Sequence, residues 1–300
     1  MPARFPDKTF YQRADVVASQ AEKEQKEEIP PSCQLIVKKE GGRDIWALGS
    51  KFILKNRKYY PGSEIEAHNT NFAADLTPDD HRIPKIINFW REGDGFLCIQ
   101  ERIEGDSLEN MLPTLTQEDL ARIGKGLGEY LLKFRNTSAP RMEMRNQEPV
   151  IDRRLFQPLL DKPDKKYTVC TSNEDVKQNL AMAIEDRIDR GTLVALMAKM
   201  PSATPFTFTH SDLHEGNIMV KDGEFSGIVD WELAGYYPVW WEFVDLCEVI
   251  SDHLPAEVKH EAALEWFRVY HAIRDGTDRE EVARMVDAYL PAYQIVLPGQ

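Results

Sequence analysis

The stretch FTFTHSDLHEGNIMVKDGEFSGIVDWELAGYYPVWW, residues 206–241, decides how this chain folds. The alternation of Phe and Thr over residues 206–209 is typical of a strand, and the apolar residues 218–220 predict a second strand. An Asp-Gly pair, which favours a tight turn, precedes residues 225–229, which we expect to return as a third strand. This hairpin would bring Asp230, at its end, back beside the loop that follows the first strand.

Polar side chains gather in that loop and at the end of the hairpin. Asp212 is able to accept the proton of a hydroxyl group, and the oxygens of Asn217 and Asp230 are hard ligands of the kind that Mg²⁺ prefers. The spacing therefore indicates phosphoryl transfer from a nucleotide. The alternative is a hydrolase metal site built on His210, Asp212 and His214, which would need a second His/Asp cluster elsewhere in the sequence to complete its ligands.

The same residues resemble motifs of the aminoglycoside phosphotransferase and choline kinase group of protein-kinase-like enzymes. Residues 210–212 with Asn217 resemble the catalytic loop of the group, and residues 230–232 resemble its metal-binding segment. The form FTHSDLHEGNI…GIVDWELAGYYPVWWE is especially similar to the fungal-type members. The resemblance implies a bilobal α+β fold with a small antiparallel β-sheet lobe and a larger, mainly helical lobe. It also implies that Asp212 is the catalytic residue and that Asn217 and Asp230 hold Mg²⁺.

Lys55 ends the apolar run Phe52-Ile53-Leu54, and we expect residues 51–55 to be the third strand of the small lobe. The resemblance implies that Lys55 reaches the α- and β-phosphates of ATP. Glu66 has two interpretations. In the first, its carboxylate reaches back to the backbone amide of Ser63 in a capping box at the start of a helix. In the second, which the resemblance implies, Glu66 pairs with Lys55, with Glu64 as the fallback partner.

The resemblance also implies a hinge between the lobes around Gln100, Glu101 and Ile103, whose backbone groups would hydrogen-bond the adenine of the nucleotide. Protein kinases cover the phosphates with a G-x-G-x-x-G loop. This chain has only Gly41 and Gly42 in the expected place, so we expect a reduced grip on phosphate. The sequence leaves the choice between ATP and GTP open.

The order of the predicted elements divides the chain into three parts. Residues 1–32 are an N-terminal extension with a predicted solvated helix, and residues 33–103 are the small nucleotide-binding lobe with a five-stranded antiparallel sheet and one helix. Residues 104–300 are the large helical catalytic lobe. Within that lobe, residues 137–172 lack a clear periodicity, and a connection of that length often has a functional role.

The composition narrows the class of protein. A net charge of −13 without a basic stripe argues against nucleic-acid binding. No apolar run approaches the roughly 18 residues that span a bilayer, and the N-terminus lacks the apolar core of a secretory signal. The four cysteines are far apart, which disfavours a zinc site or a disulfide framework and indicates reduced thiols in the cytoplasm. The sequence does not predict an oligomeric state.

Acidic and aromatic residues are mixed in the segment after Asp230. Aromatic rings beside carboxylates are able to hold a cationic acceptor, with which the negative net charge is compatible. The competing interpretation is that Trp240, Trp241 and Phe243 anchor a helix in the core. That helix is predicted to start near Val239. The acidic residues concerned are Glu232, Glu242, Asp245 and Glu248.

Two functions fit the sequence. The first is an ATP-dependent phosphotransferase that moves the γ-phosphate to a hydroxyl of a small molecule, such as an aminoglycoside-, choline- or metabolite-like acceptor. The second is a catalytically weak or inactive kinase-like pseudoenzyme that binds a nucleotide or a partner. A protein kinase is disfavoured because His214 stands where those enzymes place a lysine. In addition, Trp231-Glu232 leads almost directly into a helix, which leaves no activation loop.

Overall fold

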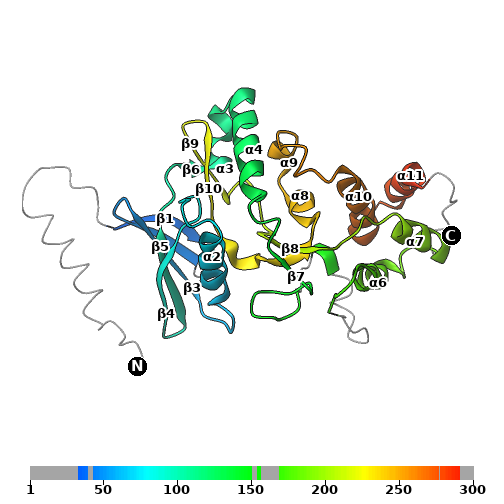
Figure 1. Ribbon diagram of the computed structural model, residues 1–300, viewed down its shortest axis with the longest axis horizontal. Helices are drawn as coiled ribbons and strands as arrows, with labels where there is room; N and C mark the ends of the chain where they lie inside the picture. The colour runs from blue at the N-terminus through cyan, green and yellow to red at the C-terminus, as the bar shows by residue number, and fades with distance from the viewer. Residues whose placement is uncertain (1–32, 40–42, 151–153, 157–168, 277, 291–300) are drawn as a thin grey trace, which may run out of the picture. The chain divides into compact units, whose positions relative to one another are not determined.

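The computed structural model describes residues 33–39, 43–150, 154–156, 169–276 and 278–290, and its contacts divide the chain into two compact units (Figure 1). The first unit comprises the described residues up to Ser63 together with Lys85–Arg102. The second unit comprises Glu64–Pro84 and the described residues from Ile103 onward. The helix predicted in the N-terminal extension and the Gly41-Gly42 pair lie outside the described residues.

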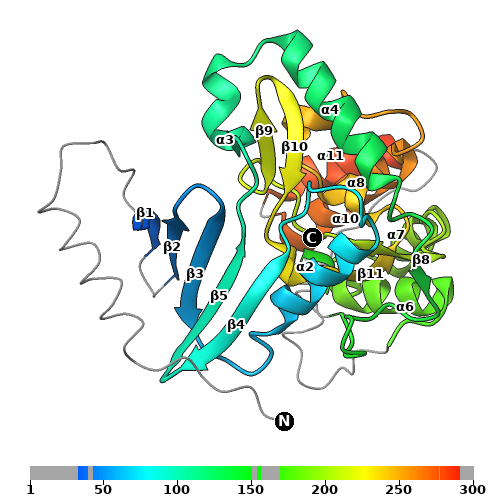
Figure 2. The ribbon, with the colours of Figure 1, turned by 60° about the vertical axis from the view of Figure 1, so that its left-hand side comes forward.

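The first unit is a five-stranded antiparallel sheet in the order β1-β2-β3-β5-β4 (Figure 2). Its strands are β1 (Cys33–Lys39), β2 (Arg43–Leu48), β3 (Phe52–Lys58), β4 (Ile86–Glu92) and β5 (Gly95–Glu101). The turn between β4 and β5 passes through Gly93 at φ +61°, in the left-handed region that glycine adopts without steric cost. The antiparallel sheet predicted for the small lobe is confirmed.

Lys55 lies inside β3, so the strand predicted over residues 51–55 was too short. β3 continues to Lys58 and pairs with β5 along its whole length. The polar residues 56–58, which extend β3 beyond the predicted strand, pair with β5, and Arg57 also packs against a side chain of β5. The guanidinium of Arg57 lies 5.5 Å from the ring centroid of Phe96 in β5, at a distance typical of a cation–π contact.

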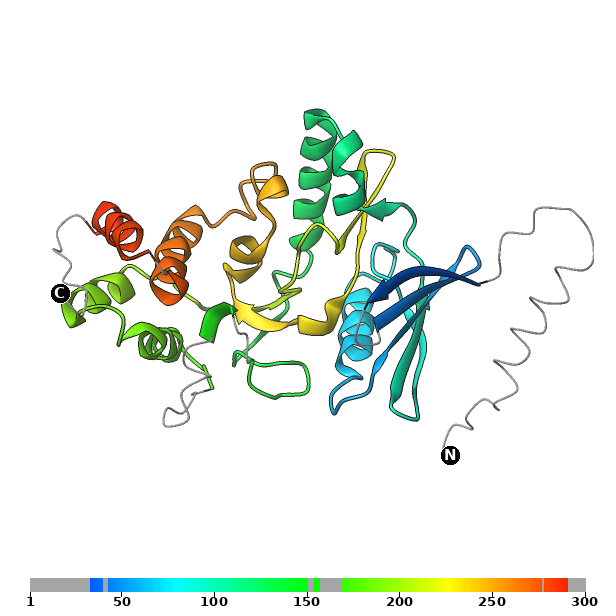
Figure 3. The ribbon, with the colours of Figure 1, turned by 180° about the vertical axis from the view of Figure 1, so that it is seen from behind.

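The second unit is mainly helical (Figures 1 and 3). Its helices are α2 (Ile65–Asp75), α3 (Leu108–Met111), the 3₁₀ helix η1 (Leu112–Thr114), α4 (Gln117–Leu131), α6 (Asn173–Ile184), α7 (Arg190–Ala198), the 3₁₀ helix η2 (Trp231–Leu233), α8 (Trp241–Asp245), α9 (Glu248–Ser251), α10 (Glu261–Asp275) and α11 (Arg279–Tyr289). Helix α4 starts with a capping box, in which the side chains of Thr116 and Asp119 each accept from the backbone N–H of the other residue. Within the described residues, no helix has the length and apolar character that crossing a membrane requires.

Two small antiparallel sheets frame the candidate site, in the orders β10-β9-β6 and β11-β8-β7. Their strands are β6 (Asp106–Ser107), β7 (Ser138–Ala139), β8 (Phe206–Thr209), β9 (Ile218–Lys221), β10 (Glu224–Ile228) and β11 (Gly235–Pro238). The predicted hairpin is confirmed as β9 and β10. The sequence did not reveal β11, which pairs with β8 and buries Tyr237. β11 ends at Pro238 and a turn follows it, so that α8 begins at Trp241 rather than near Val239.

Helix α2 groups with the second unit by its contacts, although the sequence placed it in the small lobe, residues 33–103. Asn69 accounts for this attachment. Its Nδ2 donates hydrogen bonds to the carbonyl oxygens of Trp231, at 3.0 Å, and Ala234, at 2.9 Å. A buried amide thus ties α2 to the η2 segment that follows Asp230. The lobe boundary at residue 103 stays a prediction.

Two clusters of buried side chains form the core of the second unit. One contains Phe208 and Trp231, whose rings stack with centroids 5.9 Å apart. The other contains Trp240, Trp241 and Trp266. Trp240 and Trp241 are each 1% exposed, which confirms that they anchor the segment after Asp230 in the core.

Candidate active site

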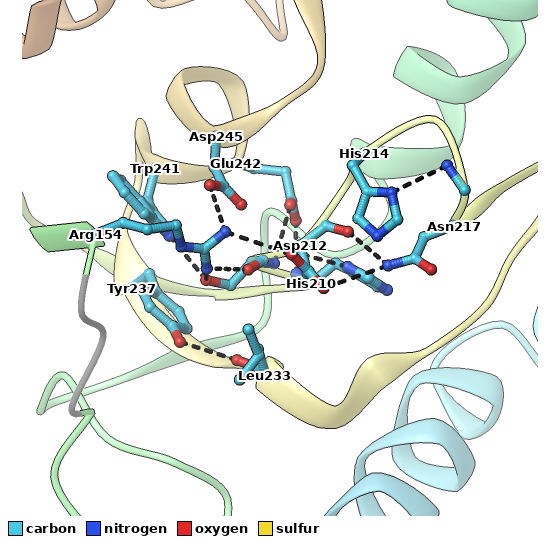
Figure 4. A network of polar contacts seen from close by, with 12 residues as sticks. Arg154, His210, Asp212, His214, Asn217, Leu233, Tyr237, Trp241, Glu242 and Asp245 are labelled. Atoms are coloured by element: carbon cyan, nitrogen blue, oxygen red, sulfur yellow. Dashed lines mark hydrogen bonds and ion pairs between the residues drawn. The ribbon is translucent and has the colours of Figure 1, made fainter. Parts of the chain in front are cut away.

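His210 connects the loop that carries Asp212 to the end of the β9–β10 hairpin (Figure 4). Its side chain is fully buried, and its Nδ1 accepts a hydrogen bond from the backbone N–H of Asp212 at 3.2 Å. Its Nε2 therefore donates to the carbonyl oxygen of Val229, at 3.0 Å, at the end of the hairpin. Burial lowers the pKa of His210 to about 4, so the ring is neutral at pH 7. The predicted return of Asp230 to the loop is confirmed.

Asn217 closes the loop that Asp212 opens. Its side-chain Nδ2 donates to the backbone carbonyl oxygen of Asp212 at 2.9 Å. Its backbone carbonyl oxygen accepts from the N–H of Val229 at 3.0 Å. Because the amide nitrogen faces Asp212, the amide oxygen points the other way. That orientation suits an oxygen ligand for a cation.

Asp230 lies with two other carboxylates. The ligating oxygens of Glu66, Asp230 and Glu232 are all within 4.8 Å of one another. The backbone of Asp230 is left-handed, at φ +68°, which costs roughly 1–2 kcal/mol for a residue with a side chain. A divalent cation with a preference for oxygen ligands fits this group because its charge offsets the repulsion among the carboxylates. Glu232 lies in the segment 230–232 that resembles the metal-binding segment of the family, but it was not itself among the predicted metal ligands.

Glu242 is the residue whose role the sequence missed most clearly. It extends from α8, and its two carboxylate oxygens accept the backbone N–H groups of His210, at 2.7 Å, and Ser211, at 3.2 Å. Ser211 has φ +64°, so these bonds fix a strained turn directly before Asp212. Burial of Glu242 raises its pKa to about 7, although the two N–H donors oppose that shift.

Arg154 is the second residue that the sequence missed. It donates to Asp245 Oδ1 at 2.6 Å and to the carbonyl oxygen of Ser211, and it lies 3.6 Å from Asp212 Oδ1. The indole of Trp241 donates to Ser211 Oγ at 2.8 Å. Arg154 comes from the unpatterned stretch 137–172, which offered no signal of its role.

The carboxyl of Asp212 is half-buried, and this burial raises its pKa. The charge of Arg154 and the nearby His214 act in the opposite direction. A half-buried carboxylate beside a cation is suited to accept a proton from a hydroxyl group that it orients.

A family model described as the phosphotransferase enzyme family matches residues 46–284. The chain belongs to this phosphotransferase enzyme family. Among solved structures, aminoglycoside phosphotransferase APH(4)-Ia aligns with a TM-score of 0.52 at 12% identity, covering 91% of this chain and 96% of that one. A thermostable mutant of the same enzyme, in a ternary complex with ADP and hygromycin B, aligns with a TM-score of 0.51 at 12% identity, covering 85% and 90%. No curated protein sequence matches this chain significantly.

At these identities the likeness to solved structures shows the fold of the family, which is bilobal, α+β and protein-kinase-like. The residues predicted to bind the nucleotide are divided between the two units. Lys55, Gln100 and Glu101 belong to the sheet of the first unit, and Gln100 is buried, whereas Ile103 and Glu66 belong to the second. Their roles at the nucleotide, including the pairing of Lys55 with Glu66, stay predictions.

The capping-box interpretation of Glu66 is wrong. The helix begins at Ile65, and its N-cap residue, Glu64, makes no side-chain capping bond. The N–H of Ser63 donates to the carbonyl oxygen of Tyr60 at 3.0 Å, and its hydroxyl accepts from the N–H of Tyr60 at 3.0 Å. Because Ser63 is used by this turn, it is not available to Glu66.

Proposed function

We propose that this member of the phosphotransferase enzyme family transfers the γ-phosphate of ATP to a hydroxyl group of a small molecule. The observation that carries the proposal is the joining of Asp212, Asn217 and Asp230 through His210 and the β9–β10 hairpin. A proton acceptor beside oxygen ligands for Mg²⁺ is the arrangement that phosphoryl transfer needs.

Each side chain has a distinct role in this proposal. Asp212 orients the acceptor hydroxyl and takes its proton as the oxygen attacks phosphorus. Asn217 and Asp230 hold Mg²⁺, with Glu232 close enough to Asp230 to share a cation. When bound, Mg²⁺ neutralises charge on the phosphates of ATP. The protein contributes mainly by positioning these groups.

The nucleotide-binding roles in the proposal are those that the family resemblance implies. Lys55, steadied by Glu66, contacts the α- and β-phosphates in the proposal. The backbone near Gln100, Glu101 and Ile103 hydrogen-bonds the adenine. These roles follow from the family resemblance, as does a closer relation to fungal-type members. The cytoplasmic location, which was inferred from the spacing of the cysteines, also stays a prediction.

The pseudoenzyme alternative is not favoured. Lys55, Asp212, Asn217 and Asp230, the residues that the reaction needs, are all present. The solved structures with this fold include the aminoglycoside phosphotransferase mutant in complex with ADP and hygromycin B, both of which are ligands of that protein. For the present chain we carry over only the coarser class, a small hydroxylated acceptor. That this acceptor is cationic stays a prediction.

The test is the release of ADP from Mg²⁺-ATP with a panel of hydroxylated acceptors. Asp212→Asn should lower turnover by at least about a hundredfold, the scale of general base catalysis, and leave the thermal midpoint within a few degrees of wild type. Asp222→Asn is the matched control, because Asp222 is exposed at the turn of the same hairpin. Full activity in Asp212→Asn would rule out the proposed role.

A further inference from the structure

Arg154 lies in a short segment, residues 154–156, that is anchored in the core of the second unit. The next two side chains, Leu155 and Phe156, are buried in one of its core clusters. The hydroxyl of Tyr270, in α10, donates to the carbonyl oxygen of Leu155 at 2.8 Å. Because the backbone directly after Arg154 is fixed in this way, its long side chain extends from a defined position.

The guanidinium of Arg154 makes contacts through both of its terminal nitrogens (Figure 4). One of them, Nη1, donates to Asp245 Oδ1 at 2.6 Å and lies 3.6 Å from Asp212 Oδ1. The other, Nη2, donates to the carbonyl oxygen of Ser211 and to Ser211 Oγ, the latter at 3.1 Å. The planar guanidinium fixes the angle between these contacts, a geometry that the single nitrogen of a lysine does not reproduce.

Two residues of α8 direct this guanidinium. The side chain of Asp245 is only 8% exposed, so its ion pair with Arg154 is largely shielded from water. The guanidinium carbon lies 5.6 Å from the ring centroid of Trp241, in the range of a cation–π contact. The indole N–H of Trp241 also donates to Ser211 Oγ at 2.8 Å. Arg154 and Trp241 therefore converge on one residue, Ser211.

Ser211 is the residue through which these contacts reach Asp212. Its N–H donates to Glu242, its carbonyl oxygen accepts from Arg154, and its hydroxyl accepts from Trp241. All three polar groups of Ser211 are thus engaged, and together they hold a backbone at φ +64° that is otherwise unfavourable. Because Ser211 directly precedes Asp212, this turn sets the direction in which the Asp212 side chain leaves the backbone.

The two oxygens of the Asp212 carboxylate face different partners. Oδ1 lies 3.6 Å from Arg154 Nη1, and Oδ2 accepts from Nδ2 of Asn217 at 3.4 Å. The terminal torsion of an aspartate has a broad energy minimum, so contacts at both oxygens are needed to restrict it. A general base has to lie within hydrogen-bond reach of the proton that it takes, which makes this restriction important for the reaction.

We propose that Arg154 is a positioning residue that holds the Ser211 turn and the Asp212 carboxylate in the orientation that phosphoryl transfer needs. This inference rests on the proposed phosphotransferase function and adds a residue to it. Arg154 acts through Ser211 and Asp212, and Asp245 orients Arg154. A misplacement of about 1 Å is able to cost a hundredfold in rate. The loss of Arg154 should therefore slow the chemical step and leave ATP binding intact.

The test measures ADP release from Mg²⁺-ATP, with water, choline, glycerol and hygromycin B each offered as the acceptor. Arg154→Gln removes the charge, Arg154→Lys keeps the charge without the paired geometry, and Asp245→Asn removes the orienting carboxylate. Arg122→Gln is the matched control. Arg122 is also partly exposed and pairs with two carboxylates, Asp119 and Glu224, at the turn end of the β9–β10 hairpin.

The proposal expects both Arg154 variants to lower kcat by about ten- to a hundredfold. KM for ATP and the Mg²⁺-ATP thermal shift should stay close to those of wild type. Asp245→Asn should also lower kcat, and adding it to Arg154→Gln should cause little further loss, since the two residues act as one unit. Arg122→Gln should match wild type throughout.

A wild-type kcat in Arg154→Gln or in Arg154→Lys would overturn the proposal. So would a fall in kcat that is accompanied by an equal loss of the Mg²⁺-ATP thermal shift, because a purely structural role gives that result. If Arg154→Gln does not fold, Arg154→Lys decides the question, since its ammonium still offers a charge to Asp245. Absence of ADP release by wild type with every acceptor, water included, would instead refute the underlying phosphotransferase function.

Discussion

Glu242→Gln is expected to change how the stability of the second unit depends on pH. Burial raises the pKa of Glu242 from 4.5 to about 7, so the folded protein holds a proton that the unfolded chain releases at lower pH. The contribution of Glu242 to stability is therefore fully present below about pH 4.5 and is lost as the pH rises through 7. At about 1.4 kcal/mol per pH unit, the loss amounts to roughly 3 kcal/mol as an upper bound.

Glutamine keeps the shape of the side chain but does not titrate. It also presents an N–H₂ group to one of the two backbone N–H donors, His210 or Ser211, which adds a cost that does not depend on pH. The free energy of unfolding of wild type minus that of Glu242→Gln should therefore fall by up to about 3 kcal/mol between pH 4.5 and pH 8. Two cations lie near this carboxyl, Arg154 and, across a small cavity, Arg135, and both stay charged throughout this range.

The assay is chemical denaturation at a series of pH values, followed by tryptophan fluorescence, because Trp240 and Trp241 directly precede Glu242 in sequence and are buried. Glu265→Gln, an exposed site on α10, is the control and should track wild type. A difference between wild type and Glu242→Gln that stays constant with pH would refute the assigned burial effect. A difference that rises with pH would mean that the two N–H donors outweigh burial.

Two further predictions concern the bonds that hold the site together. Asn69→Leu should lower the free energy of unfolding by about 1–3 kcal/mol in chemical denaturation, because the carbonyl oxygens of Trp231 and Ala234 lose their donor. An unchanged midpoint would show that α2 does not depend on these bonds. Ser211→Ala should be less stable than Ser211→Gly by about 1 kcal/mol. Both variants lose the hydroxyl that accepts from the Trp241 indole, but only glycine adopts φ +64° without steric strain. Equal stability of the two variants would contradict that account of the turn.

The sequence predicted the part of the site that is local. Asp212, Asn217 and Asp230 are linked by one hairpin whose Asp-Gly turn is visible in the sequence, so their convergence followed from strand and turn preferences alone. For Trp240 and Trp241 the sequence left two interpretations open, a place in the core or a contact with a cationic acceptor. Both side chains are buried, which favours the first. The hairpin is decided by interactions within a short stretch of chain, whereas the two tryptophans are buried by distant residues such as Trp266 and Phe267 of α10.

The parts that were missed depend on contacts between distant residues. Arg154 reaches Ser211 across 57 positions, and Glu242 reaches Ser211 across 31, so neither pairing leaves a periodic trace in the sequence. The attachment of α2 to η2 depends on one amide, Asn69, which bonds a carbonyl 162 positions away. β11 was missed because Gly235–Pro238 gains its extended form from pairing with β8 rather than from its own residue preferences.

The most direct measurement of the central claim is the thermal midpoint with and without Mg²⁺-ATP, compared among wild type, Asp230→Asn and Asp222→Asn. A ligand at about a hundred times its dissociation constant stabilises the folded state by roughly 2.7 kcal/mol, which is a measurable shift. Asparagine tolerates the left-handed backbone at both positions, so neither replacement should disturb the fold. We predict a Mg²⁺-dependent rise in wild type and Asp222→Asn that is lost or much reduced in Asp230→Asn. An equal rise in all three proteins, or no rise in wild type, would contradict the assignment of this hairpin as the metal–nucleotide site.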